Sequence, residues 1–152
     1  PRSTLFPYTT LFRSVYQAST FAGNPISVTA AINSIKTINR IKNKLYAKLE
    51  RNCELLVDEI DDLATDHKIP HQINSIASMF QIFFSNKPVT NYNTSKNADG
   101  KKFNKLFSNL LKNGVFIAPS QFESVFLSDA HTDTDITKTL GAYGLSLKAV
   151  KH

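Results

Sequence analysis

The stretch QINSIASMFQIFF, residues 72–84, decides the fold because the spacing of the hydrophobic residues changes within it. Upstream they recur every three or four positions, which is typical of amphipathic helices. Here they follow the tighter patterns of strands. The sequence predicts two strands, 72–76 and 78–84, and the second is apolar enough to be buried on both faces. Phe80, Phe83 and Phe84 are expected in the core.

Two helices are predicted before these strands. Asn24-Pro25 pairs an N-cap residue with a proline at the first helical position, which opens a helix over residues 25–38. A longer amphipathic helix is expected over roughly 41–67, ended by Pro70. Cys53 borders its apolar stripe and is interpreted as a core residue, not as a reactive thiol.

After the strands, helices and strands are expected to alternate again. The predicted elements are a polar loop (86–100), a helix stopped at Gly114, short strands at 115–117 and 125–127, and a last helix opened by a capping box of Thr132 and Asp135. This order favours an α/β chain of the α+β kind, with helices on one small, mostly antiparallel sheet.

The first fourteen residues fit none of these patterns. They include TLFPYTTLFRS (residues 4–14), which has no helical or strand period and is too short and polar for a signal peptide. Back-translated, the segment resembles the adapter that is ligated to DNA fragments for short-read sequencing. We therefore predict that residues 1–14 are a translated adapter artefact and that the native sequence from Val15 onward is the C-terminal part of a longer protein.

Composition argues against several classes of function. Hydrophobic residues make up 41% and charged residues 20%, a globular balance, and the net charge of +6 falls to +4 without Arg2 and Arg13. Basic residues do not interleave with aromatic ones, so nucleic-acid binding is not favoured. Residues 4–14 do not form a transmembrane span, and no membrane partner is expected. A single cysteine excludes an internal disulfide and fits the cytoplasm. No metal site is expected, because Pro70 separates His67 from His71.

Three stretches contain polar residues that packing of a core does not explain. Ser19-Thr20 places two hydroxyl groups just before a helix N-terminus, where donors and the helix dipole favour a phosphate. Val89–Tyr92 puts an aromatic residue among amides in the polar loop. Ala118–Glu123, followed by Ala130-His131-Thr132, places a carboxylate between two short apolar segments. Taken singly, each also fits an ordinary loop.

Together, five segments resemble one family. They are VYQASTFAGNP (15–25), SMFQIFFS (78–85), VTNY (89–92), GVFIAPSQFES (114–124) and DAHT (129–132). In this order and spacing they resemble the C-terminal third of the glutamate-1-semialdehyde 2,1-aminomutases, a family of class-III aminotransferases with pyridoxal-phosphate fold type I. The resemblance covers essentially all of residues 15–152.

The resemblance implies roles for particular residues. Ser19 and Thr20 match the segment that binds the phosphate of pyridoxal 5'-phosphate or pyridoxamine 5'-phosphate across a homodimer, although Ser19 replaces a more usual glycine. Glu123 matches a catalytic glutamate near cofactor and substrate. Residues 15–40 would be the tail of the cofactor-binding domain, and 41–152 the small C-terminal domain. The lysine that binds the cofactor covalently would lie upstream, so the chain alone is expected to be inactive.

The implied reaction isomerises glutamate-1-semialdehyde to 5-aminolevulinate for tetrapyrrole biosynthesis. The residues add a physical argument, since no arginine follows Arg51 to clamp a substrate carboxylate. A carboxylate at Glu123 would instead favour an amine. Two alternatives stay open at this stage: another class-III enzyme, such as an ω-amino acid transaminase, and a non-catalytic RNA- or protein-binding domain.

Overall fold

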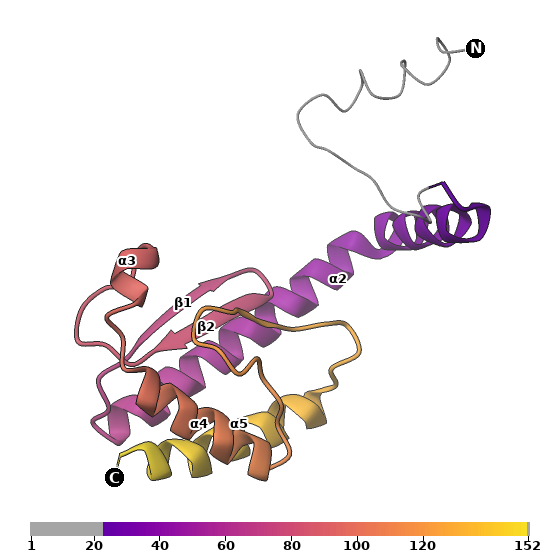
Figure 1. Cartoon of the computed structure of the whole chain (residues 1–152). Helices are drawn as coiled ribbons and strands as arrows, with labels where there is room; N and C mark the ends of the chain where they lie inside the picture. The colour runs from indigo at the N-terminus through magenta and orange to yellow at the C-terminus, as the bar shows by residue number, and fades with distance from the viewer. Residues whose placement is uncertain (1–22, 152) are drawn as a thin grey trace, which may run out of the picture. The chain divides into compact units, whose positions relative to one another are not determined.

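The structure, a computed structural model, describes residues 23–151. The chain divides into two units, residues 1–41 and 42–152, which are treated separately below. The secondary structure runs in the order α2, β1, β2, α3, α4, β3, α5 (Figure 1). None of the described helices is long and apolar enough to cross a membrane.

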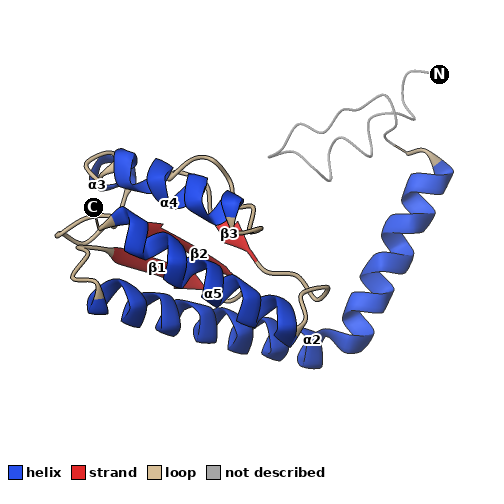
Figure 2. Ribbon diagram, turned by 90° about the horizontal axis from the view of Figure 1, so that it is seen from below, coloured by secondary structure: helices blue, strands red, loops and turns tan. Residues whose placement is uncertain are grey.

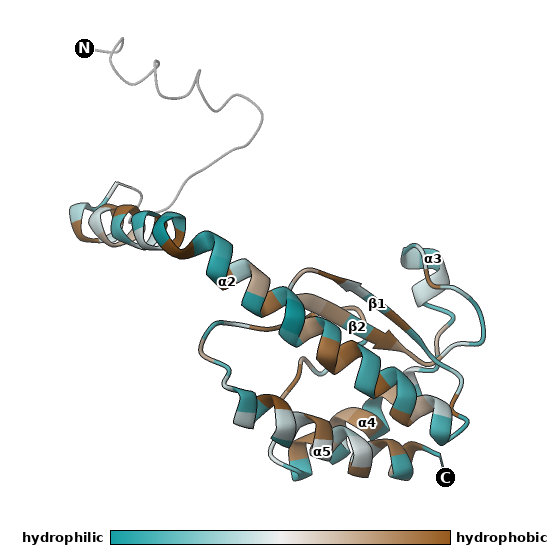
Figure 3. Ribbon diagram, turned by 180° about the vertical axis from the view of Figure 1, so that it is seen from behind, coloured by the Kyte–Doolittle hydropathy of each residue, from teal (hydrophilic) through white to brown (hydrophobic). Residues whose placement is uncertain are grey.

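Helix α2, Pro25–Asp66, replaces the two helices predicted over 25–38 and 41–67. The prediction of a break was wrong because neither proline nor glycine occurs between Ile38 and Ile41, so nothing interrupts the backbone hydrogen bonds. The predicted N-cap is confirmed, since Asn24 Oδ1 accepts from the backbone N–H groups of Ile26 at 3.0 Å and Ser27 at 3.2 Å. Both hydrophilic and hydrophobic residues occur all along the helix (Figure 3).

The unit of residues 42–152 contains one antiparallel sheet in the order β1-β2-β3. Strand β1 is Gln72–Ile76, β2 is Met79–Phe83 and β3 is Val125–Phe126. The first two strands match the predicted pair and align Ile73 with Ile82. They are joined by a tight turn in which Ala77 has a positive φ of 51°. The third strand pairs Met79 with Phe126.

The strand predicted at 115–117 does not form. Helix α4, Gly100–Lys112, ends at Gly114, whose φ of 81° is the left-handed conformation expected of a C-terminal glycine. The chain then runs extended without pairing to a neighbouring strand. Ile117 is buried in the core while Phe116 is 73% exposed. Ile117 therefore contributes to the core although its segment does not pair with the sheet.

Two further helices complete this unit. A single turn, α3 (Tyr92–Ser95), forms inside the segment predicted as a polar loop, and Asn91 caps it with a capping box. Helix α5, Asp133–Val150, begins with the predicted box of Thr132 and Asp135. Helices α4 and α5 pack against each other and lie with the second half of α2 on one face of the sheet (Figure 2).

Strand β2 is buried on both faces, as predicted. Phe80 and Ile82 belong to the main core, together with the buried residues of the three helices. Phe83 points to the opposite face, where it packs with Val89 and Ala98 in a second small cluster. Gln81 shares that second face and is only 5% exposed. The residues that follow this strand therefore cover the face that the helices leave open.

Candidate functional site

The segment Pro119–Ser124, which carries Glu123, is held to the sheet by side-chain amides. Gln81 Nε2 donates to the backbone oxygen of Gln121 at 3.0 Å, and Gln121 Nε2 donates to the backbone oxygen of Ser95 at 3.4 Å. The segment closes on itself through a bond from Glu123 N–H to the backbone oxygen of Ser120 at 3.2 Å. Its conformation is thus defined by contacts to β2 and to α3.

Glu123 itself is exposed at the tip of this turn. Among the described residues its carboxylate has no hydrogen-bond or ion-pair partner. The partner that a carboxylate between two apolar segments would need is therefore not supplied by this unit. Its neighbours Phe122 and Ser124 line a cavity of about 230 Å³ on the open face of the sheet. Glu123 itself does not line this cavity.

The cavity beside Glu123 has amide, hydroxyl and apolar walls. Its lining residues are Asn74, Ser75, Ile76, Met79, Gln81, Phe83, Gln121, Phe122 and Ser124. A second hollow adjoins it and shares Asn74, Phe83 and Phe122 with it. Tyr92 lines this second hollow, and its ring lies 5.8 Å from that of Phe122. The predicted stretches 89–92 and 118–123 are thus brought together on one face.

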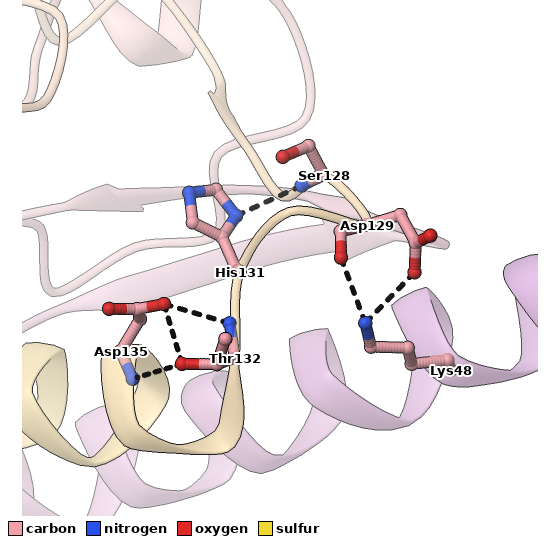
Figure 4. Close-up of polar contacts among 6 residues, drawn as sticks. All are labelled: Lys48, Ser128, Asp129, His131, Thr132 and Asp135. Atoms are coloured by element: carbon pink, nitrogen blue, oxygen red, sulfur yellow. Dashed lines mark hydrogen bonds and ion pairs between the residues drawn. The ribbon is translucent and has the colours of Figure 1, made fainter.

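The third predicted segment, Asp129–Thr132, has a different setting (Figure 4). Lys48 Nζ of α2 bonds both Asp129 Oδ1 at 2.8 Å and the Asp129 backbone oxygen at 2.9 Å. His131 Nδ1 accepts from the backbone N–H of Ser128 at 3.0 Å, so in this arrangement the proton of a neutral ring sits on Nε2. These contacts hold the connection between β3 and α5.

The capping box at α5 also perturbs a carboxyl group. Asp135 Oδ2 accepts from the Thr132 hydroxyl at 2.7 Å and from the Thr132 backbone N–H at 2.8 Å. The hydroxyl, and after it the N–H, hold the pKa of Asp135 below its ordinary value because both stabilise the carboxylate. His131 and Asp135 line a separate cavity with Tyr143, away from the cavity beside Glu123. This segment therefore has a structural role within the unit.

Cofactor and metal sites can be tested only in part. Ser19 and Thr20, the predicted phosphate-binding residues, lie outside the described residues. Among residues 23–151, no lysine or arginine lines the cavity beside Glu123, so that cavity offers no cationic side chain to a phosphate. Within the same range, no three histidine, cysteine, aspartate or glutamate residues cluster as metal ligands would.

Cys53 lies in the core, as predicted, and is 1% exposed. Burial, and secondarily the charge of Glu54, raise the pKa of its thiol, which disfavours the reactive thiolate.

Sequence reasoning missed the amides on the open face of the sheet. The signal was present in the alternation of β2, because a period of two places Gln81 opposite Phe80 and Ile82. The prediction of β2 depended on its apolar residues, so Gln81 was not considered as a site residue.

Comparison with known proteins decides the family. Residues 7–141 match the family described as Aminotransferase class-III. The chain belongs to the class-III aminotransferases. The matched range begins inside the segment 1–14 that we predict to be adapter-derived, and that origin remains a prediction.

Several relatives of this class-III chain are named glutamate-1-semialdehyde 2,1-aminomutase. It is 72% identical over 138 residues to a glutamate-1-semialdehyde 2,1-aminomutase of Nitrosopumilus maritimus, covering 91% of this chain and 32% of that protein. A glutamate-1-semialdehyde 2,1-aminomutase 1 of Cenarchaeum symbiosum is 54% identical over 138 residues, covering 91% and 33%. The chain thus spans about a third of the length of the relatives it matches.

Solved structures support the class-III fold. An omega-transaminase from Sphaerobacter thermophilus superposes with a TM-score of 0.71 at 16% identity, over 91% of this chain and 31% of that one. A PLP form of the FumI protein of Sphingopyxis sp. MTA144 gives 0.71 at 25% identity, over 91% and 30%. The predicted α/β fold, with helices on a small antiparallel sheet from a pyridoxal-phosphate enzyme, is confirmed.

Proposed function

We propose that this chain is the C-terminal third of a glutamate-1-semialdehyde 2,1-aminomutase, which isomerises glutamate-1-semialdehyde to 5-aminolevulinate for tetrapyrrole biosynthesis in the cytoplasm. The observation that carries the proposal is the 72% identity over 138 residues with the aminomutase of Nitrosopumilus maritimus. The 54% identity with a second aminomutase supports it. Residues 15–40 would form the tail of the cofactor-binding domain, and residues 41–152 would form the small C-terminal domain.

In the proposed enzyme, two parts of this chain act on cofactor and substrate. Ser19 and Thr20 would donate hydrogen bonds to the phosphate of pyridoxal or pyridoxamine 5'-phosphate across a homodimer. The bound cofactor supplies an electron sink for the amino-group transfer. Glu123 would disfavour a substrate carboxylate at its end of the pocket and favour an amino group, because like charges repel where water is excluded.

A transaminase of the same family is the second candidate, since the matching solved structures include an omega-transaminase. The absence of any arginine after Arg51 counts against a transaminase that clamps an α-carboxylate from this region.

Assay of the complete reading frame separates the two candidates. The full-length protein, loaded with cofactor, is expected to form 5-aminolevulinate from glutamate-1-semialdehyde without a second amino acceptor. A transaminase would instead require a keto acid and consume an ω-amino acid. The 152-residue chain serves as the control and is expected to show neither activity. Formation of product only when a keto acid is added would overturn the aminomutase proposal.

A further inference from the structure

We propose that one end of the open face of the sheet is an interface, and that a part of the same polypeptide outside these 152 residues covers it. The open-face patch consists of Ile76, Met79, Phe122 and Phe126. The inference rests on the proposed function in one respect, since it takes the chain to be part of a longer aminomutase. It goes beyond that function by naming the residues on which another part of the protein packs.

Three residues of the patch form a row across the three strands. Ile76 of β1 pairs with Met79 of β2, and Met79 pairs with Phe126 of β3. Directly paired residues of an antiparallel sheet point to the same face. Met79 points with Gln81 and Phe83 to the open face, because side chains alternate along a strand. The row is therefore apolar and lies on the face opposite α2, α4 and α5.

This row faces water within the described part of the chain. Ile76 is 69% exposed and Phe126 is 64% exposed, and Met79 between them is half-buried. Gln81 and Phe83, farther along β2, are already buried, so only this end of the face is uncovered. An antiparallel sheet with one face in water normally carries polar residues on that face. An exposed apolar row there indicates a face that another surface covers.

Phe122 continues the row from the neighbouring turn. It lines the same cavity as Ile76 and Met79, and it is 53% exposed. Its ring lies 5.8 Å from that of Tyr92, which is 66% exposed. Among residues 23–151, no charged residue lines this cavity or the adjoining hollow. Aromatic and methionine side chains without charges are typical of the centre of a protein interface.

The length of the relatives selects what covers the patch. The match covers 32% and 33% of the aminomutases of Nitrosopumilus maritimus and Cenarchaeum symbiosum, so most of each lies outside the segment that corresponds to this chain. A part of the same polypeptide is tethered at high effective concentration and loses less entropy on packing than a second molecule does. The remaining sequence is therefore the occupant, and a second copy is an outcome of the test.

The test measures cysteine labelling in the complete protein. Ile76→Cys and Phe126→Cys each place a thiol in the patch. Leu145→Cys on α5 is the matched control, because Leu145 is 57% exposed and lies outside the patch. Under native conditions a maleimide should label the two patch positions at least about tenfold more slowly than the control, since a covered thiol reacts only when the interface opens. In urea all three should react alike. Peptide mass spectrometry follows the introduced thiol alone, and equal native rates at patch and control overturn the interface.

Photo-crosslinking identifies the occupant, and it decides alone if the cysteine variants do not fold. A benzoylphenylalanine at position 126 keeps an aromatic ring in the patch. We expect it to link to a peptide of the same polypeptide outside residues 15–152. A mixture of ¹⁴N- and ¹⁵N-labelled protein reveals links between copies, because such pairs carry both labels. Links between copies, links only within residues 15–152, or the lack of any link overturn the proposal.

The interface and the proposed function can fail independently. A complete protein that forms 5-aminolevulinate but labels patch and control positions alike refutes the interface and leaves the aminomutase activity in place. A complete protein without that activity, whose patch is protected and links to the remaining sequence, refutes the proposed function and supports the interface.

Discussion

Gln81 donates a hydrogen bond from its side-chain amide to the backbone oxygen of Gln121, 3.0 Å away and 40 positions later in the chain. The bond joins the central strand of the sheet to the turn that presents Glu123. Because Glu123 has no side-chain partner among the described residues, its position depends on how firmly this turn is held. A buried residue of β2 thereby controls the placement of an exposed carboxylate.

Replacing Gln81 by leucine should loosen this turn. The change leaves the Gln121 oxygen buried without a donor, which costs about 1–3 kcal/mol. We expect faster amide hydrogen exchange at Phe122–Ser124 and a lower free energy of unfolding in urea. Gln72→Leu is the matched control and should leave exchange in the turn unchanged. Unaltered exchange at Glu123 in Q81L would show that the turn is held by other contacts.

Replacing Tyr143 by phenylalanine should stabilise the fold. Tyr143 is completely buried, its hydroxyl has no partner among the described residues, and burial raises its pKa far above the ordinary value. Removing an unpaired hydroxyl while keeping the ring should raise the free energy of unfolding by about 1 kcal/mol. Tyr46→Phe, at a 57% exposed position, is the control with no expected change. A loss of stability in Y143F would mean that the hydroxyl has a partner after all.

The capping box of α5 should make stability depend on acid pH. The pKa of Asp135 is lowered from an unfolded value near 3.8, so its carboxylate stabilises the folded state above that value. The contribution is lost as pH falls through the lower folded pKa. We expect Asp135→Ala to destabilise the chain at pH 7 and to match wild type at the lowest pH, as followed by urea unfolding.

Thr132→Val provides the companion test, since it keeps the shape but removes the hydroxyl that lowers the Asp135 pKa most. It should reduce the same pH-dependent difference in stability. Parallel profiles for wild type and D135A over the acid range would contradict a role for this carboxylate.

Local signals in the sequence predicted local structure well. Four features depend only on residues close in the chain and could therefore be predicted from the sequence. They are the hairpin, the Asn24 cap, the helix end at Gly114 and the capping box of Thr132 and Asp135. Burial of β2 on both faces followed from its apolar run. The predicted helix break near residue 40 was wrong, because no proline or glycine stands there to interrupt the helix.

Long-range pairing could not be predicted from the same signals. Whether 115–117 joins a sheet depends on a free strand edge, which the sequence does not display. The partners of Gln81, Asn74 and Gln121 lie 15 to 40 positions away, so these hydrogen bonds form only once the chain is folded. The catalytic role of Glu123 and the phosphate-binding role of Ser19 and Thr20 came from resemblance and remain predictions.

Thr20→Val tests the phosphate-binding role in the complete protein. The variant keeps the side-chain shape and removes the hydroxyl, so it should weaken cofactor binding by about 1–3 kcal/mol, the usual loss for a hydrogen bond to a charged group. Titration of the cofactor-free protein measures it. Thr29→Val, near the start of α2 and outside the segment 15–25, is the control with no expected change. Equal affinity in wild type and T20V would make Thr20 an ordinary loop residue.

Glu123→Gln tests both the site and the substrate argument in the complete protein. If the carboxylate disfavours a substrate carboxylate, its removal should lower aminomutase turnover and raise side transamination of α-amino acids, since a repulsive element against the wrong substrate is gone. Both half-reactions can be followed by cofactor absorbance. Glu59→Gln, an exposed position on α2, should change neither, because surface substitutions usually stay within about 0.5 kcal/mol. If the two rates in E123Q move together, or neither moves, Glu123 does not set substrate selectivity.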